Sequence, residues 1–182
     1  MIGDPRLITR IALFSALVYV LSWTTSAFPN VNLLFFVLFS AGFLWGALPG
    51  ILVGLIGVGL WTAFNPYGPA TWPVMLAQMT GAAACGVVGS FFIRTGWAWQ
   101  GRVRRSAGLV IAATVCTCVY YLPVSAVDAW LFQPFWPRFI TGMMWSLISL
   151  VSNVVIFPLL FGVVRHLYER EGSLSWRNRQ QS

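Results

Sequence analysis

The sequence predicts an all-α integral membrane protein, a bundle of six transmembrane helices with both termini in the cytoplasm. Composition is the first reason. Of the residues, 58% are hydrophobic and 8% charged, with a mean hydropathy of +0.78, whereas a soluble domain carries about 25% charged residues. Length is the second reason, since 182 residues hold about six spans of about 20 apolar residues each. No stretch is polar enough for a separate soluble domain, so residues 1–182 are expected to form one transmembrane domain.

The placement of the charges is the third reason. All eleven basic residues are arginines, and the formal net charge is +7. Ten of them fall in three clusters: Arg6 and Arg10; Arg94, Arg102, Arg104 and Arg105; and Arg165, Arg170, Arg177 and Arg179. Cytoplasmic loops are enriched in Lys and Arg, so all three clusters are expected inside, which requires an even number of spans. Short juxtamembrane loops explain the positive charge, and no nucleic-acid partner is expected.

The first span is expected at about residues 7–27. A cleaved signal peptide ending near Thr25-Ser26-Ala27 is the alternative interpretation. Four residues at helical spacing share one face of this span: Ala12, Ala16, Tyr19 and Trp23. The side chains in the inner half of this face are small, and those in the outer half are aromatic. A disposable signal needs no such face, which favours a retained helix.

The later spans repeat the apolar pattern between short loops. They are expected at about 31–45, 48–64, 73–93, 106–127 and 138–167. Glycines at positions 46, 50 and 54 stand at four-residue spacing, which favours close approach of helix backbones in a membrane. Pro158 is expected to kink the last span, and the polar tail 169–182 is expected to be frayed.

A stiff loop of nine residues, Asn65 to Pro73, separates the third and fourth spans. It holds three prolines, one glycine and no charge. Proline cannot continue a helix and restricts the residue before it, and a stiff loop carrying Asn, Tyr and Trp loses little entropy on ordering around a ligand. We therefore expect this loop to cover a ligand pocket. A plain outer connector with interfacial aromatic residues is the alternative.

No catalytic constellation is present, so an enzyme is not expected. The only histidine, His166, lies at the inner end of the last span. None of the four acids lies mid-span, so the carboxylate relay of a proton pump is missing: Asp4, Asp128, Glu169 and Glu171. The three cysteines lie within apolar runs, as small buried side chains do, and neither a disulfide framework, a metal site nor a cofactor is expected.

Neutral polar residues in the outer half instead predict a ligand site. Asn153 lies near the centre of the last span, where an unpartnered amide would cost several kcal/mol. It is therefore expected to face the bundle and to bond either a helix or a ligand. Gln78 lies between one and two turns below the outer end of its span, near the expected depth of Asn65 and Trp72.

Aromatic side chains complete this predicted site and suit a planar heteroaromatic ligand by stacking. The candidate binding residues are Asn65, Tyr67, Trp72, Gln78, Trp130, Trp145 and Asn153. Asp128 and Arg138 flank the third outer loop, 128–137, and either pair with each other or meet a charged ligand group.

Three motifs and the six-span layout carry a resemblance to a known family. The first span holds Ala12-Leu13-Phe14-Ser15-Ala16, an Ala-x-x-x-Ala motif. A glycine-rich stretch, FLWGALPGILVGLIG, joins the second and third spans, and the loop NPYGPATWP is followed by Ala77-Gln78 and Gly81. Over about residues 7–167 the chain resembles the S component of an energy-coupling factor (ECF) transporter, the membrane subunit that captures a vitamin or micronutrient.

The resemblance implies a mechanism and a set of partners. A vitamin-like small molecule would bind near the outer face under the capping loops. Ala12 and Ala16 would form the flat helix surface that docks on the transmembrane T component, which two cytosolic ATPases drive. The protein would thus be a multi-pass protein of the plasma or inner membrane, surrounded by the lipid bilayer. A subset of the family binds cobalamin through a cysteine; Cys85 is the one cysteine on an expected pocket-facing helix, but it lies three turns deep.

Two other functions remain open at this stage. Small six-span proteins of similar shape serve as non-transporting scaffolds in the cell-wall elongation machinery, and these have less need of a polar, aromatic outer pocket. A stand-alone secondary transporter is the other possibility, although the sequence shows no inverted internal repeat to support it.

Overall fold

The computed structural model describes residues 4–26 and 31–180, and for residues 172–180 it describes the backbone alone. In this part of the chain all regular secondary structure is helical and there is no β-strand, which confirms the predicted all-α class. The helices are α1 (Pro5–Thr25), α2 (Leu34–Trp45), α3 (Ala47–Ala63), α4 (Trp72–Arg94), the short 3-10 helix η1 (Trp97–Trp99), α5 (Arg102–Leu131) and α6 (Phe135–Gln180).

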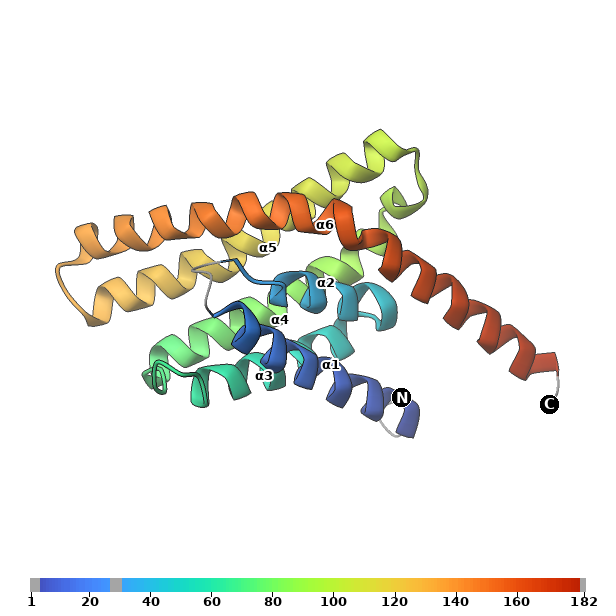
Figure 1. Cartoon of the computed structure of the whole chain (residues 1–182), viewed down its shortest axis with the longest axis horizontal. Helices are drawn as coiled ribbons and strands as arrows, with labels where there is room; N and C mark the ends of the chain where they lie inside the picture. The colour runs from blue at the N-terminus through green and yellow to red at the C-terminus, as the bar shows by residue number, and fades with distance from the viewer. Residues whose placement is uncertain (1–3, 27–30, 181–182) are drawn as a thin grey trace.

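The helices lie side by side along the long axis of the molecule (Figure 1). α3 packs between α1 and α4, and α4 in turn packs on α5, which pairs with α6. α2 contacts every other long helix and so occupies the centre of the bundle. α6 projects beyond the bundle at its C-terminal end, and it changes direction along its length. Pro158 lies inside this helix, as the sequence predicted for a kink.

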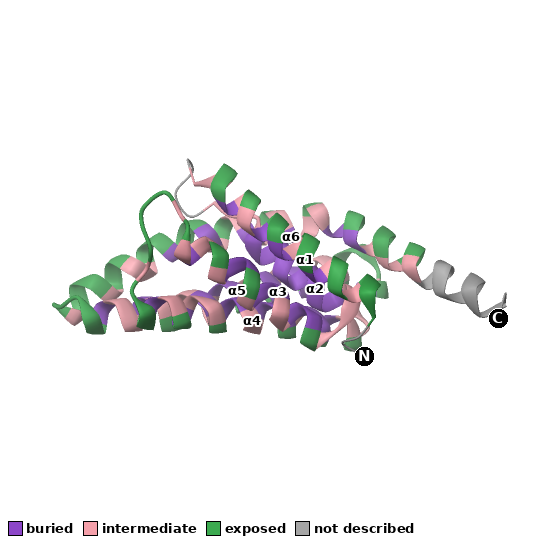
Figure 2. Ribbon diagram, turned by 90° about the horizontal axis from the view of Figure 1, so that it is seen from below, coloured by how far each residue is buried: buried purple, intermediate pink, exposed green. Residues whose placement is uncertain are grey.

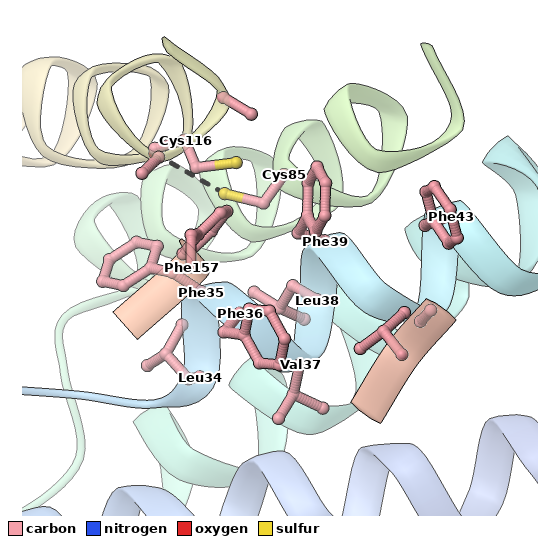
Figure 3. Close-up of a cluster of buried hydrophobic side chains, with 14 of the residues drawn as sticks. Leu34, Phe35, Phe36, Val37, Leu38, Phe39, Phe43, Cys85, Cys116 and Phe157 are labelled. Carbon is pink, nitrogen blue, oxygen red and sulfur yellow. Dashed lines mark hydrogen bonds between the residues drawn. The ribbon is translucent and has the colours of Figure 1, made fainter. Parts of the chain in front are cut away.

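The central position of α2 follows from its side chains. Ten consecutive residues, Leu34 to Phe43, are buried (Figure 2). A helix that is apolar on all sides is stable only when neighbours cover all of it. Its phenylalanines form the middle of an aromatic cluster (Figure 3), in which Phe39 lies 5.1 Å from Phe157 and 5.4 Å from Phe92 between ring centroids.

Glycines bring α2, α3 and α4 into backbone contact, as the sequence predicted for the glycine-rich third span. A Cβ atom built on Gly42 would lie 1.8 Å from the carbonyl oxygen of Gly86, and one on Gly86 would lie 2.4 Å from the carbonyl carbon of Gly50. No larger residue fits at such a crossing. Gly46 serves differently: its φ of 96° lets the chain reverse between α2 and α3 in a single residue.

Several helix ends differ from the predicted boundaries. The expected outer loop 128–137 is mostly helical, because α5 continues to Leu131 and α6 begins at Phe135. At the other end, α6 continues to Gln180, past the predicted span and through most of the segment 169–182 where fraying was expected. The connection expected between the first two spans, at about 28–30, lies outside the described residues.

Within the described residues, four helices are long and apolar enough to cross a membrane: α1, α4, α5 and α6 as far as Glu171. α2 and α3 are shorter, at 12 and 17 residues. At 1.5 Å per residue these two measure about 18 Å and about 25 Å, whereas a bilayer core is about 30 Å thick. The predicted count of six spans therefore stays a prediction.

The basic clusters meet at one end of the bundle. An ion pair of 3.1 Å joins Arg10 near the start of α1 to Glu171 on α6, and the indole Nε1 of Trp45 at the end of α2 donates to the same carboxylate at 3.1 Å. Trp99 in η1 contacts Tyr168 of α6 with 5.5 Å between ring centroids. The arginines of the α4–α5 connection thus share this basic end with those of α1 and α6.

A candidate ligand cavity at the end opposite the arginines

The opposite end of the bundle contains a cavity of about 410 Å³. Every described helix reaches it at the end remote from the basic clusters, except the short η1. Its lining residues are Ser22, Thr25, Ser26, Val31, Asn32, Leu34, Phe35, Trp61, Tyr67, Gln78, Tyr120, Tyr121, Val124 and Trp145. None of these described residues is charged. The volume lies in the range of small-molecule sites, about 300–1,000 Å³.

Aromatic rings form much of the wall. Phe35 stands edge-on to Tyr120 at 5.1 Å between centroids and lies 5.8 Å from Tyr121. The Tyr121 hydroxyl is hydrogen-bonded to the Ser149 hydroxyl at 2.8 Å, which fixes its ring on the α5–α6 side. Trp61 and Trp145 add two indoles. Such rings offer flat apolar faces on which a planar ligand stacks.

Several polar groups of the lining offer hydrogen-bond acceptors. The hydroxyls of Ser22 and Thr25 donate to carbonyl oxygens of their own helix, at 2.8 Å and 2.7 Å. Their remaining lone pairs are available to a ligand donor. The amide oxygen Oε1 of Gln78 is buried and has no hydrogen-bond partner in the described part of the chain. A buried, unpartnered amide oxygen beside a cavity indicates a place for a ligand N–H or O–H group.

The proline loop lies at the rim of the cavity, and Asn65 holds it together. The Asn65 side chain accepts from the backbone N–H of Tyr67 at 2.9 Å and donates to the carbonyl of Gly68 at 2.9 Å. This is the local turn geometry that asparagine favours. The Tyr67 hydroxyl then donates to the backbone oxygen of Ser26 at 2.9 Å, which joins the loop to the end of α1. Asn65 therefore shapes the loop, while Tyr67 lines the cavity.

The cavity brings together three of the seven predicted binding residues: Tyr67, Gln78 and Trp145. Trp72 and Trp130 lie outside its lining, with 75% and 71% of their surfaces exposed. Asn153 is deeper and fully buried, and its amide donates to the Thr117 hydroxyl at 2.9 Å. The Asn153 nitrogen therefore has a helix partner, whereas its Oδ1 has no hydrogen-bond partner in the described part of the chain, so both of the alternatives foreseen for Asn153 stay open.

Other predicted features also find structural partners. Arg138 and Asp128 form an ion pair of 2.6 Å, the simpler of the two outcomes foreseen for them. Cys85 is buried and donates to the backbone of Gly81 and Cys116, so it does not line the cavity (Figure 3). Among the described residues no cluster of metal-ligating side chains is found.

Sequence reasoning did not find most of the lining. Ser22 and Thr25 lie near the end of α1 and Asn32 precedes α2, whereas Phe35, Tyr120 and Tyr121 lie inside strongly apolar segments. Only the Tyr-Tyr pair before Pro123 gave a signal, because two adjacent hydroxyls within an apolar helix need partners. Nothing in the sequence around Trp61, at the end of the glycine-rich span, predicted that it would line a cavity.

The fold and the cavity together describe an all-helical protein with long apolar helices and a cavity of uncharged lining between the helix ends. Comparison with protein-family models places residues 4–166 in the family described as "ECF-type riboflavin transporter, S component". The match covers most of the chain, so the protein belongs to this family, and the predicted ECF S component is confirmed. Neither a comparison with curated proteins nor one with solved structures gives a significant match.

Proposed function

We propose that this protein is the substrate-binding subunit of an ECF transporter and that it captures riboflavin, or a close neutral relative, in the cavity opposite the arginines. The observation that carries the proposal is the lining itself: aromatic walls, hydroxyl acceptors and the unpartnered Gln78 oxygen, without a charged residue among the described members. The isoalloxazine ring of riboflavin is planar and bears an imide N–H, and its ribityl chain supplies several hydroxyl donors. These groups match stacking walls and acceptors.

The uncharged lining also favours riboflavin over its phosphorylated forms. A phosphate group needs cationic partners or several N–H donors when it leaves water. The nearest candidate at this end, Arg138, is already paired with Asp128. Riboflavin is therefore expected to bind more tightly than flavin mononucleotide.

The positive-inside rule supports an outer location for the cavity, since the arginines gather at the other end. Both termini would then be cytoplasmic. In this arrangement α2 and α3 would cross with the help of the connecting segments at their outer ends, which gives the six spans that the sequence predicted. The protein has no catalytic role in this proposal, and it requires no cofactor.

The proposal includes docking on the T component, which the two cytosolic ATPases drive. Ala12 and Ala16 are both exposed on α1, within an apolar face that also exposes Ile8 and Val20. Two small side chains one turn apart let another helix approach closely. Ala12→Trp and Ala16→Trp are expected to abolish co-purification with the T component, whereas Leu159→Trp on the exposed face of α6 should leave the complex intact.

Titration of the purified protein with riboflavin, followed by quenching of flavin fluorescence, tests the site. Trp145→Ala should weaken binding by about tenfold or more, because a stacking wall is lost. Trp130→Ala is the matched control: this tryptophan belongs to the same end of the molecule but not to the lining, so its removal should leave the Kd unchanged. Equal losses in both variants would contradict the site.

Mass spectrometry of small molecules retained by the purified protein tests the ligand class. A stoichiometric flavin is the expected result. A protein that retains no ligand and gains no thermal stability from riboflavin or from a panel of vitamins would contradict the proposal and favour a scaffold function.

A further inference from the structure

A second cavity lies far from the ligand site, on the outside of the bundle between α4 and α5. Its volume is about 460 Å³. The walls are aliphatic and aromatic: Val87, Val88, Phe91, Ile111, Ala112 and Val115. The hydroxyl of Thr95, also in the lining, already donates to the backbone of its own helix at 2.7 Å. This α4–α5 groove therefore offers a ligand only apolar contacts along its length.

The groove is open to the surroundings of the bundle. Phe91 is 67% exposed, and Ile111 is 51% exposed. Both lie on helices long and apolar enough to cross a membrane, so the groove faces the hydrocarbon of the bilayer rather than water. A concave apolar surface in this position fits a flexible hydrocarbon chain.

The indole of Trp97 forms the end of the groove nearest the basic clusters. A Cβ atom built on Gly108 would lie 2.2 Å from the Cε3 atom of Trp97, so the ring packs directly on the α5 backbone. Trp97 also stands edge-on to Phe92, with 6.5 Å between centroids. A tryptophan at the end of a membrane helix, apolar on one side and bearing an N–H, is typical of the interfacial region where lipid headgroups lie.

Arginines lie close in sequence to the residues at this end of the groove, Thr95, Trp97 and Gly108. Segment 94–105 carries four arginines and no acid: Arg94, Arg102, Arg104 and Arg105. All four acidic residues of the protein are described, and none of them pairs with these arginines. Three of the arginines fall in the first four residues of α5, at the positive end of its helix dipole, where positive side chains are unfavourable without a counter-charge.

We propose that the α4–α5 groove is a binding site for an anionic phospholipid of the inner leaflet. One acyl chain would lie along Phe91 and Ile111, and the phosphate headgroup would lie among the arginines of segment 94–105. Basic pockets between membrane helices on the cytoplasmic side bind anionic headgroups in this way. The occupant is a lipid rather than a protein helix because the segment next to the apolar groove carries four arginines that no acidic residue pairs. This site is independent of riboflavin capture.

Native mass spectrometry tests the site on the full-length protein. The protein is reconstituted in nanodiscs of equal parts phosphatidylglycerol and phosphatidylcholine, released into mild detergent and analysed for retained lipid. One retained phosphatidylglycerol per protein is expected, preferred over phosphatidylcholine by about tenfold. Equal retention of the two lipids, or no retained lipid, would overturn the proposal.

Two pairs of variants separate headgroup from chain recognition. Arg102→Gln with Arg105→Gln should remove most of the preference for phosphatidylglycerol, whereas Arg6→Gln, at the same end on α1, should not. Ile111→Trp fills the groove and should reduce retention of both lipids, whereas Val155→Trp, on the exposed face of α6, should not.

Riboflavin titration of the same variants shows that each is folded, because none of the changed residues lines the ligand cavity. Unchanged lipid retention in Ile111→Trp would overturn the proposal. If Ile111→Trp also failed to co-purify with the T component, the groove would be a helix-docking surface instead.

Discussion

The two halves of the bundle differ in how completely their helices fill the space between them. In the middle and toward the arginines, α2, α3 and α4 touch through backbone atoms, because Gly42, Gly50 and Gly86 have no side chain to separate them. Toward the other end the helices contact one another through Phe35, Tyr120 and other large rings, and a cavity of about 410 Å³ remains. The half with the glycine contacts, which also holds the aromatic cluster around Phe39, is closed, whereas the half lined by Phe35 and Tyr120 is open around the cavity.

The largest effect is expected from disturbing the closed half. Gly86→Ala introduces a Cβ atom 2.4 Å from the carbonyl carbon of Gly50, and neither backbone can move without displacing a helix. The loss of stability should be about 1–3 kcal/mol or more, measured as a fall in the melting temperature of the purified protein.

Gly162→Ala is the matched control for this substitution. A Cβ atom at Gly162 would meet nothing within 4 Å. The same chemical change should therefore be neutral or stabilise the helix by about 0.5–1 kcal/mol. Similar melting temperatures for the two variants would contradict the conclusion that backbone contacts at glycines hold the closed half together.

Substitutions in the open half should change the affinity for riboflavin rather than the stability of the fold. Gln78→Ala removes the unpartnered acceptor from the cavity and should raise the Kd for riboflavin by about tenfold, since one hydrogen bond to the ligand is lost. Gln100→Ala removes an amide at the basic end and should not change the Kd. A fall in melting temperature at Gln78 with unchanged affinity would instead make this residue part of the packing.

Asn153 lies between the two halves, and its substitution tests whether it contributes to packing or to ligand binding. Asn153→Ala removes the bond to Thr117 and should lower the free energy of unfolding by about 1 kcal/mol. The Kd should change by less than about threefold, because Asn153 does not line the cavity. Ser152→Ala is the control, since that hydroxyl donates only to its own helix. An increase in Kd beyond threefold with an unchanged free energy of unfolding would place Asn153 in the ligand site.

The smallest effect is expected from the ion pair between Asp128 and Arg138. Both side chains are substantially exposed, at 33% and 47%, and exposed pairs contribute about 0–1 kcal/mol. A double-mutant cycle with Asp128→Asn and Arg138→Gln should give a coupling energy in this range that falls as salt is added. A loss of riboflavin affinity in either variant would show that the pair belongs to the ligand site.

The candidate cavity includes only some of the residues that the sequence predicted for a ligand site. Tyr67, Gln78 and Trp145 were found because each is a polar or interfacial residue near an expected helix end. Trp72 and Trp130 show the same signal, yet their side chains lie outside the cavity lining. Position along the chain gives depth in the membrane, whereas the rotation of each helix about its axis decides whether a residue faces the cavity.

By itself, the sequence determined the membrane class, the all-helical fold and the segregation of the arginines. These follow from composition, from apolar segment length and from the cost of burying charge, none of which depends on distant contacts. Only the tertiary structure decided that α2 lies at the centre, that Asn65 organises its loop and that Asn153 bonds Thr117. Residues such as Phe35 and Tyr120 acquire their role only when helices far apart in sequence meet, because an apolar segment does not encode which of its faces will border a space.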